Sequence, residues 1–372
     1  MTLEHSEFDK EAVQQVANDV LAPNAGVTDR EAQFPQASVD ALAAAGLLTL
    51  EGGQLSTTDL TTIGRILGGS CGSTAMVWAM HHVQVACVAR HAMGEQALLG
   101  SLAKLGASGG VMASVTSEVG TGGDLLNSIT SCETDGATTT VTKDSSTCSY
   151  GAQASSFLIT ARRGPDSPSN DQVAVLAELD QVKLTPKGVW NPMGMRGTCS
   201  PPFLVEATIP SSQVLPVPFS DIAAQTMVPL SHILWSSVWI GMAEEAIRRA
   251  TLMVRSKRKT STAEFDRRLA IAETPLRLVR SLLAAVVARY DSGYDVSLDP
   301  NALIELNDLK LAASTLTVEC AQRCLEIVGI PGYQEGGPLS VARIIRDLYS
   351  ARLMIANERL IATNSTLLLM NR

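Results

Sequence analysis

The chain has 372 residues, of which 45% are hydrophobic and 18% are charged, so it can bury a large apolar core and is not intrinsically disordered. Its 37 acidic residues outnumber 29 Lys and Arg, and this net charge of -8 argues against a nucleic-acid partner, because phosphate binding needs a basic surface. No apolar run is long enough to span a membrane and the first ten residues do not resemble a secretory signal, so we expect a cytoplasmic protein.

The first third of the chain has a helical pattern. Apolar residues between Glu7 and Gly106 recur at helical spacing, and Pro23, Pro35 and Gly46 divide the pattern into short segments. We therefore predict an N-terminal helical domain over residues 1–110. The sequence GGSCGS at 68–73 is interpreted as small-residue packing beside a helix and not as a phosphate loop.

The middle of the chain, residues 111–220, is rich in Thr, Ser and Val, with frequent Gly and Pro. Four stretches have the composition of short strands: 137–143, 155–163, 172–179 and 202–209. The segment GPDSPSND at 164–171 has the composition of a hairpin loop. These patterns predict a small central β-barrel or β-sandwich domain.

Long helical patterns return over residues 231–255, 262–291, 302–328 and 340–369, and they predict a C-terminal four-helix bundle over residues 221–372. Helices, strands and helices thus follow one another in separate blocks. This order predicts a mostly helical α+β protein and excludes an alternating βαβ fold.

Seven cysteines are spread along the chain without a CxxC pair, which argues against a disulfide framework and against a zinc site. Cys320 and Cys324 lie four residues apart in an apolar helical pattern, and we expect both to be buried packing residues. No metal site is predicted.

Five local patterns follow one another along the chain. They are DREAQFPQASVDALAAAGLL (29–48), CGSTAMVWAMHHVQVACVARHA (71–92), SVTSEVGTGGDLL (114–126), NPMGMRGTCS (191–200) and IVGIPGYQEGGPLSVARIIRDLYSA (327–351). In their order and spacing these patterns resemble the acyl-CoA dehydrogenase family of flavoproteins across essentially the whole chain. The resemblance implies the three-domain fold, a FAD cofactor and a homodimer or homotetramer assembled through the last bundle.

The resemblance assigns one part of the flavin site to segment 114–126. Thr116 and Ser117 correspond to residues that contact the edge of the flavin ring, and Gly122 and Gly123 to residues near the pyrophosphate or the substrate. Glycines suit this role because no Cβ prevents their N–H groups from approaching a ligand. An ordinary structural loop is the alternative interpretation.

A second flavin segment corresponds to 147–151, where the Ser149 hydroxyl matches a group near flavin N5. A Ser/Thr-rich strand end is the alternative there. The resemblance further assigns Gly329 and Asn357 to cofactor binding. Lys257 and Arg258 lie where relatives carry an Arg-x-x-Phe-Gly motif that reaches the FAD of a neighbouring subunit; they either hold the FAD diphosphate or form a basic helix end.

The activity that the resemblance implies is oxidation of an acyl thioester, on CoA or a carrier protein, and the electron acceptor stays open between an electron-transfer flavoprotein, oxygen and none. Such desaturation needs a carboxylate to remove a proton while hydride leaves for the flavin. Relatives carry it at positions that correspond to Ile355 and Ser231, and neither is acidic here. Glu358, about one helical turn past Ile355, is the candidate base; the alternative is a solvated charge beside Arg359 or Arg352.

Flavin monooxygenases of the same fold lack this carboxylate and use a histidine and a hydroxyl near the flavin. His82, His232 and Ser149 are the candidates for that chemistry, and a core histidine is the alternative role of the first two. A two-component monooxygenase supplied by a flavin reductase is therefore an alternative function. A catalytically silent subunit of a hetero-oligomer is another.

Overall fold

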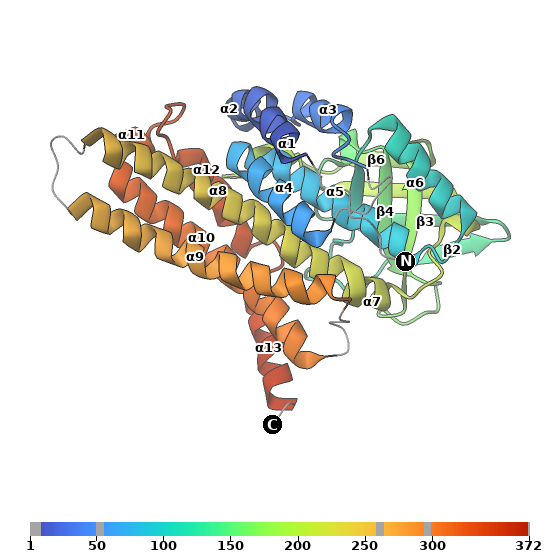
Figure 1. Ribbon diagram of the computed structural model, residues 1–372. Coiled ribbons are helices and arrows are strands. Elements are labelled where there is room, and N and C mark those ends of the chain that lie inside the picture. The colour runs from blue at the N-terminus through green and yellow to red at the C-terminus, as the bar shows by residue number, and fades with distance from the viewer. Residues whose placement is uncertain (1–8, 50–55, 258–263, 294–298, 371–372) are drawn as a thin grey trace.

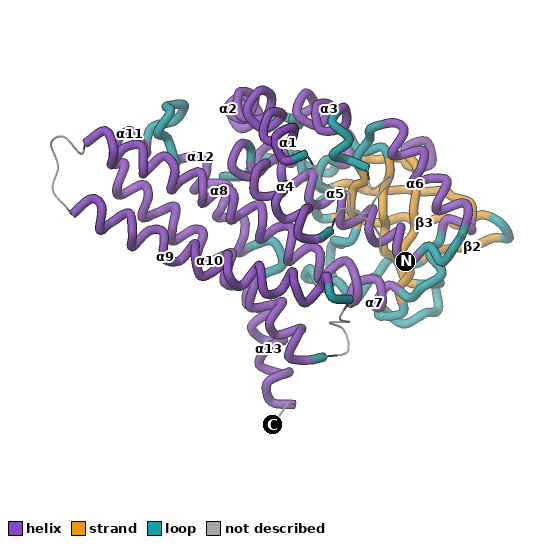
Figure 2. Tube along the Cα trace, in the orientation of Figure 1, coloured by secondary structure: helices purple, strands orange, loops and turns teal. Residues whose placement is uncertain are grey.

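The computed structural model describes residues 9–49, 56–257, 264–293 and 299–370. Along the chain a small β region stands between two helical regions, as the sequence predicts, and in space it lies at one end of the molecule with the long C-terminal helices at the other (Figures 1 and 2). None of the helices in the described parts of the chain is both long and apolar enough to cross a membrane.

The N-terminal region is helical and is built around α5, which is buried on all sides over most of its length. A helix that is enclosed in this way forms the core of its domain. Asp9 caps the first helix, and a reciprocal Ser56–Asp59 capping box starts α4. The elements are α1 (Lys10–Val16), the π-helical η1 (Ala17–Leu21), α2 (Ala22–Glu31), α3 (Gln36–Ala44), α4 (Thr57–Ser70), α5 (Gly72–His91) and α6 (Gln96–Ser108).

The central region contains two small sheets. One has the order β1-β4-β5, in which β1 runs parallel to β4 and β4 runs antiparallel to β5. The other is antiparallel with the order β2-β3-β7-β6. The strands are β1 (Met112–Val115), β2 (Cys132–Asp135), β3 (Thr138–Ser145), β4 (Ser156–Arg162), β5 (Gln172–Glu178), β6 (Val182–Pro186) and β7 (Phe203–Pro210), and the short 3₁₀ helices are η2 (Gly151–Gln153), η3 (Leu179–Gln181), η4 (Arg196–Thr198) and η5 (Ser211–Gln213).

The four strands expected from the sequence are present as β3, β4, β5 and β7, and segment 164–171 connects β4 to β5 as a hairpin. Strands β1, β2 and β6 have four or five residues each and were not predicted. Strands of this length contain too few residues for an alternation of apolar and polar side chains to be recognised in the sequence.

The C-terminal region is helical. Helices α8, α9 and α10 are long and pack along one another, while α12 and α13 contact α10. Helix α13 projects from the body of the molecule with the C-terminus at its tip (Figure 1). The elements are α7 (Phe219–Ile222), the π-helical η6 (Ala223–Met227), α8 (Val228–Lys257), α9 (Glu264–Asp291), α10 (Pro300–Val328), α11 (Ile330–Tyr333), α12 (Ala342–Leu348), the 3₁₀ helix η8 (Tyr349–Arg352) and α13 (Asn357–Met370).

The continuous helix expected over 340–369 is broken in the structure. Between η8 and α13 the chain passes through Ile355, whose φ of 51° is left-handed and incompatible with a helix. The Ile355 carbonyl accepts a hydrogen bond from the Lys310 ammonium of α10 at 2.5 Å. This contact stabilises the break from outside the segment.

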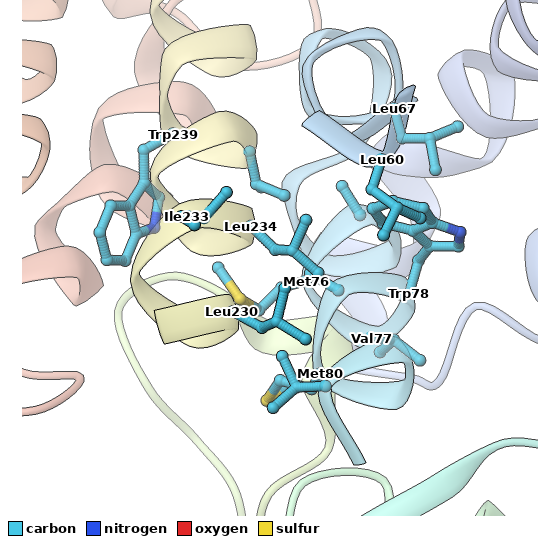
Figure 3. Close-up of a cluster of buried hydrophobic side chains, with 14 of the residues drawn as sticks. Leu60, Leu67, Met76, Val77, Trp78, Met80, Leu230, Ile233, Leu234 and Trp239 are labelled. Carbon is cyan, nitrogen blue, oxygen red and sulfur yellow. The ribbon is translucent and has the colours of Figure 1, made fainter. Parts of the chain in front are cut away.

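Glycines allow α4 and α8 to approach each other closely. A Cβ on Gly68 would lie 2.4 Å from the Val238 carbonyl oxygen, and one on Gly241 would lie 2.1 Å from the Arg65 carbonyl oxygen. These contacts confirm the small-residue packing predicted for 68–73. Nearer its N-terminal end, on the same side, α8 presents Leu230, Ile233 and Leu234 to α5 (Figure 3).

An ion pair joins the three regions of the fold. Arg346 of α12 donates to both carboxylate oxygens of Asp29 of α2, at 2.9 and 2.5 Å, and to the Met193 carbonyl at 2.9 Å. Arg196 of η4 donates to the Asp29 carbonyl at 2.7 Å. The N-terminal helices, the loop before η4 and the C-terminal helices are thereby held in one arrangement.

Candidate functional site

The loop after β1 is anchored by a buried carboxylate. Glu118 accepts hydrogen bonds from the Ser128 hydroxyl at 2.7 Å, the Ile129 N–H at 3.1 Å, and the Thr130 N–H and hydroxyl at 2.7 Å each. Burial alone would raise the pKa of Glu118, but the hydrogen bonds from Thr130 and Ser128 and the Lys143 charge hold it below its usual value. Glu118 is therefore ionised and fixes the path of residues 116–124.

Lys143 of β3 is the counter-charge of this carboxylate. It is fully buried, its ammonium lies 3.6 Å from Glu118, and it donates to the Thr160 carbonyl and hydroxyl at 2.7 and 2.9 Å. Burial lowers the pKa of Lys143 to about 8 against the attraction of Glu118. The pair ties the loop to both sheets.

The structure brings the two predicted flavin segments into contact. The Ser117 hydroxyl donates to the Thr147 carbonyl at 2.6 Å, and the Thr147 N–H donates to the Ser117 oxygen at 3.2 Å. Thr116 lies half-buried beside Ser117, with its hydroxyl 3.3 Å from that of Ser114. Residues 116–117 and 147 therefore form one continuous polar surface.

A third motif, residues 191–200, meets this surface at Ser149. The Ser200 hydroxyl donates to the Ser149 oxygen at 2.9 Å and also lies 2.9 Å from the Thr198 hydroxyl. Next to Ser149, Tyr150 is buried with a left-handed φ of 44° and donates from its hydroxyl to the Met112 carbonyl at 3.0 Å. The position of Ser149 is thus fixed by both of its neighbouring segments.

Gly122 and Gly123 form a turn whose carbonyl groups contact helix α13. Their φ angles are 61° and 79°, and two successive left-handed residues direct their N–H groups to one side. Neither N–H bonds to any residue that the structure describes. The two carbonyls accept hydrogen bonds from Arg359, at 2.7 Å for Gly122. The Gly123 N–H is trans to the Gly122 carbonyl and so points away from Arg359. Free N–H groups of a glycine turn fit a phosphate group, so the turn fits the phosphate end of a flavin nucleotide.

Glu358, Gly329 and Lys257 lie on three different elements, and no hydrogen bond joins them to the glycine turn among the described residues. Glu358 is exposed in the first turn of α13, about 100° around the helix from Arg359. Gly329 ends α10 with a φ of 74° and donates to the Leu325 carbonyl. Lys257 is the last residue of α8, and Arg258 lies outside the described residues.

Both members of the histidine pair are neutral at pH 7, because burial lowers their pKa values to about 4 for His81 and about 3 for His82. His81 accepts from the Met112 N–H at 3.0 Å, so its Nε2 carries the proton and donates to the Leu48 carbonyl at 2.8 Å. This histidine holds β1 to the N-terminal helices. His82 donates from Nδ1 to the Trp78 carbonyl, and its Nε2 has no partner among the described residues.

His82 and His232 lie on faces of α5 and α8 that point away from each other. His82 stacks on Trp78 with ring centroids 4.5 Å apart. Figure 3 shows Trp78 pointing away from α8, whereas Met76 and Met80 point toward it. His232 lies near α10, where Lys310 contributes to the lowering of its pKa. The structure therefore does not bring His82 and His232 together.

His232 belongs to a buried polar group between α8, α10 and α13. Burial lowers the pKa of His232 to about 3, and the nearby positive charge of Lys310 lowers it further. The Val228 carbonyl and Asn307 act in the opposite direction, although neither forms a hydrogen bond of normal geometry with the ring. The Lys310 ammonium donates to Asn357 at 2.7 Å as well as to the Ile355 carbonyl. Asn357, two residues after Ile355, thus contacts Lys310.

Sequence reasoning missed Arg359 as a partner of the glycine turn, and it missed Lys310. Arg359 has no local signal, since its partners lie more than 230 residues away in the chain. Lys310 had one, because it interrupts the apolar stripe of Leu306, Leu309 and Ala313 in a helical pattern. A charge at such a position is expected to have a specific partner or role.

Two family models match the sequence. The acyl-CoA dehydrogenase N-terminal domain matches residues 2–98 and the acyl-CoA dehydrogenase C-terminal domain matches residues 223–355, which together are more than half of the chain. Among curated protein sequences, none matches the chain.

Solved structures share the fold over almost the whole chain. FMN-bound TdsC, a dibenzothiophene monooxygenase from Paenibacillus sp. A11-2, is 19% identical with a TM-score of 0.84 over 97% of each chain. Butyryl-CoA dehydrogenase from Megasphaera elsdenii is 17% identical with a TM-score of 0.82 over 98% of this chain and 100% of its own. A nitrososynthase from Micromonospora carbonacea var. africana is 19% identical with a TM-score of 0.81 over 98% of each chain. At these identities the likeness establishes the fold.

Proposed function

The chain belongs to the acyl-CoA dehydrogenase family, and from this we propose that it is a flavin-dependent oxidoreductase. The observation that carries the proposal is the turn at Gly122 and Gly123, whose N–H groups are free, whose carbonyls are held by Arg359, and which follows the joined segments 116–117 and 147 along the same loop. A bound flavin supplies reversible two-electron chemistry.

Each part of this surface has a distinct role in the proposal. Ser149 holds the edge of the flavin ring through its hydroxyl and Ser117 through its main chain, while the N–H groups of the glycine turn, fixed by Arg359, hold its phosphate. Lys257 and Arg258 would add contacts to a second phosphate only if the cofactor is FAD. Titration with FAD and with FMN separates these cases, because the FAD assignment requires the tighter complex with FAD.

Of the reactions of this family, oxygen transfer to a small molecule with reduced flavin from a separate reductase fits the site best. Desaturation of an acyl thioester needs a proton acceptor opposite the flavin. Position 355 carries an isoleucine whose carbonyl is bound to an ammonium group, and position 231 carries a buried serine. Neither side chain can accept the proton.

Oxidation of an acyl thioester is the second candidate, and it depends on Glu358. This carboxylate lies at the start of α13, one residue before Arg359, so it is near the proposed flavin phosphate turn. If Glu358 is the base, Glu358→Gln abolishes bleaching of the flavin by an acyl-CoA under anaerobic conditions and leaves flavin binding unchanged. Unchanged bleaching in that variant removes Glu358 from the mechanism.

The deciding experiment is a visible absorption spectrum of the purified protein with oxidised flavin and, anaerobically, with reduced flavin. Uptake of flavin chiefly in the reduced form, followed by oxygen consumption, supports the monooxygenase. A stable yellow protein that an acyl-CoA bleaches supports the dehydrogenase instead. A protein that binds neither form contradicts both and points to a silent subunit.

A further inference from the structure

Among the residues that the structure describes, Lys143 and Lys310 are the two fully buried lysines, and they differ in their counter-charges. Lys143 has Glu118 at 3.6 Å. Lys310 donates only to uncharged oxygens, the Ile355 carbonyl and the Asn357 amide, and no carboxylate in the described parts of the chain pairs with it. A buried charge normally has an opposite charge beside it, because its desolvation is otherwise uncompensated.

The face of α8 that turns toward α10 carries further polar groups without partners. The indole nitrogens of Trp235 and Trp239 and the Ser236 hydroxyl are buried and form no hydrogen bond with described residues. Figure 3 shows Trp239 pointing away from α5. With Asn307 and Lys310 of α10 and the neighbouring His232, we call these residues the polar seam. Each unpaired donor costs about 1–3 kcal/mol in a protein without a ligand.

Helix α13 connects the polar seam to the proposed flavin surface. Asn357 contacts Lys310, and Arg359, two residues further along α13, contacts the turn at Gly122 and Gly123. Two residues advance a helix by about 3 Å and rotate it by about 200°, so these two side chains point to opposite sides of α13. A molecule held in the polar seam would therefore be separated from the glycine turn by the width of α13.

We propose that the polar seam is a subsite for the carboxylate of a small organic substrate, and that Lys310 is the residue that binds its charge. The ammonium has three donors, and only two of them are used by Ile355 and Asn357. A carboxylate beside Lys310 provides the missing counter-charge and lies near the unpaired ring nitrogens of His232. The assignment of this carboxylate to a substrate rests on the proposed function. The proposal that Lys310 binds a carboxylate does not depend on that function.

The test is isothermal titration calorimetry of the full-length protein with two pairs of probes, benzoate and benzamide, and acetate and acetamide. Each pair differs mainly in charge. We expect at least one carboxylate to bind at least tenfold more tightly than its amide, and Lys310→Met to abolish that difference. Lys183→Met is the matched control, because Lys183 is an exposed lysine paired with Glu206, and it should bind the probes like the unchanged protein.

A second measurement covers the case in which Lys310→Met does not fold. Burial lowers the pKa of Lys310 to about 8, so carboxylate binding by the unchanged protein should weaken tenfold per pH unit well above that value. His232, the other titratable group that faces Lys310, has a pKa of about 3 and stays neutral throughout. Equal binding of carboxylate and amide, no binding of either carboxylate, or affinity independent of pH between 7 and 10 overturns the proposal.

Flavin uptake is measured on the same samples. Carboxylate binding without flavin uptake supports the polar seam as an anion site and contradicts the proposed function. Flavin uptake without carboxylate binding contradicts the polar seam alone.

Discussion

Among single residues, Arg359 links the C-terminal helices to the proposed flavin site. It donates to the carbonyls of Gly122 and Gly123, so it both fixes the shape of the turn and places a positive charge close to it. A hydrogen bond to a charged group contributes about 1.5–3 kcal/mol. Arg359→Gln should therefore weaken flavin binding about ten- to a hundredfold.

Fluorescence titration with flavin measures this effect. Arg352→Gln is the control, because Arg352 is an exposed arginine in the preceding 3₁₀ helix and should not alter the affinity. An Arg359→Gln protein that binds flavin as tightly as the control would exclude a role for this guanidinium.

A different residue, Asp347, makes stability depend on pH. It is buried and accepts from the Met195 N–H at 2.6 Å. Burial raises the pKa of Asp347 from 3.8 to about 6, although that hydrogen bond and Arg343 oppose the shift. The folded protein thus holds this proton more tightly than the unfolded chain, so the contribution of Asp347 to stability is largest below about pH 4 and is lost as the pH rises through about 6.

Asp347→Asn should remove this pH dependence. Relative to the unchanged protein, the variant should gain up to about 3 kcal/mol of unfolding free energy between pH 4 and pH 7, since one pKa unit corresponds to about 1.4 kcal/mol. Urea unfolding at the two pH values measures the gain. Parallel pH profiles for the two proteins would show that Asp347 is not protonated preferentially in the folded state.

The candidate site shows which residues could be found from the sequence. Ser117, Gly122 and Gly123 lie within one motif, so a single short pattern was enough to place them together. The partners of that motif, Arg359 and Lys143, come from other elements and depend on how these pack. A local pattern carries no information about such pairs.

At the scale of elements, the same limit explains the break at Ile355. The sequence from Tyr349 to Asn357 contains neither Pro nor Gly, so nothing local ends the helix that its periodicity predicts. The left-handed residue is held by Lys310, which belongs to α10. Tertiary contacts override helix propensity here, whereas the long patterns of α8, α9 and α10 were predicted to within a few residues.

Helices α4 and α8 cross at a short distance because glycines in each helix face the backbone of the other. Gly241→Ala would place a methyl group 2.1 Å from the Arg65 carbonyl oxygen, so the helices must move apart. We expect a loss of about 1–3 kcal/mol of unfolding free energy, as for overpacked cores. Gly100→Ala on α6 is the control: its Cβ would meet nothing within 4 Å, and it should stabilise the protein by about 0.5–1 kcal/mol.

Chemical denaturation of the two variants measures this difference. If both alanines change stability by the same amount and in the same direction, helix propensity and not the close approach of α4 to α8 decides the effect.

For the whole molecule, the succession of helical, β and helical regions was predictable because each region keeps its own composition and hydrophobic periodicity over about a hundred residues. The contacts that join the three regions were not predictable. The Asp29–Arg346 ion pair spans more than 300 residues, and it acts together with Arg196 from the loop region before β7. These contacts fix the relative position of α2, η4 and α12, one element from each region.

The projecting helix α13 has consequences for assembly. Ile361 and Leu368 are exposed and lie seven residues apart, so they share one face, and the nearby Leu369 is 72% exposed. Exposed apolar side chains on a projecting element mark a protein interface, so we propose that α13 helps to form a homodimer or homotetramer. Light scattering after size exclusion should show that oligomer, Leu368→Glu should shift it toward monomer, and Val189→Glu, at an exposed apolar residue elsewhere, should not. A monomeric unchanged protein at tens of micromolar would contradict the interface.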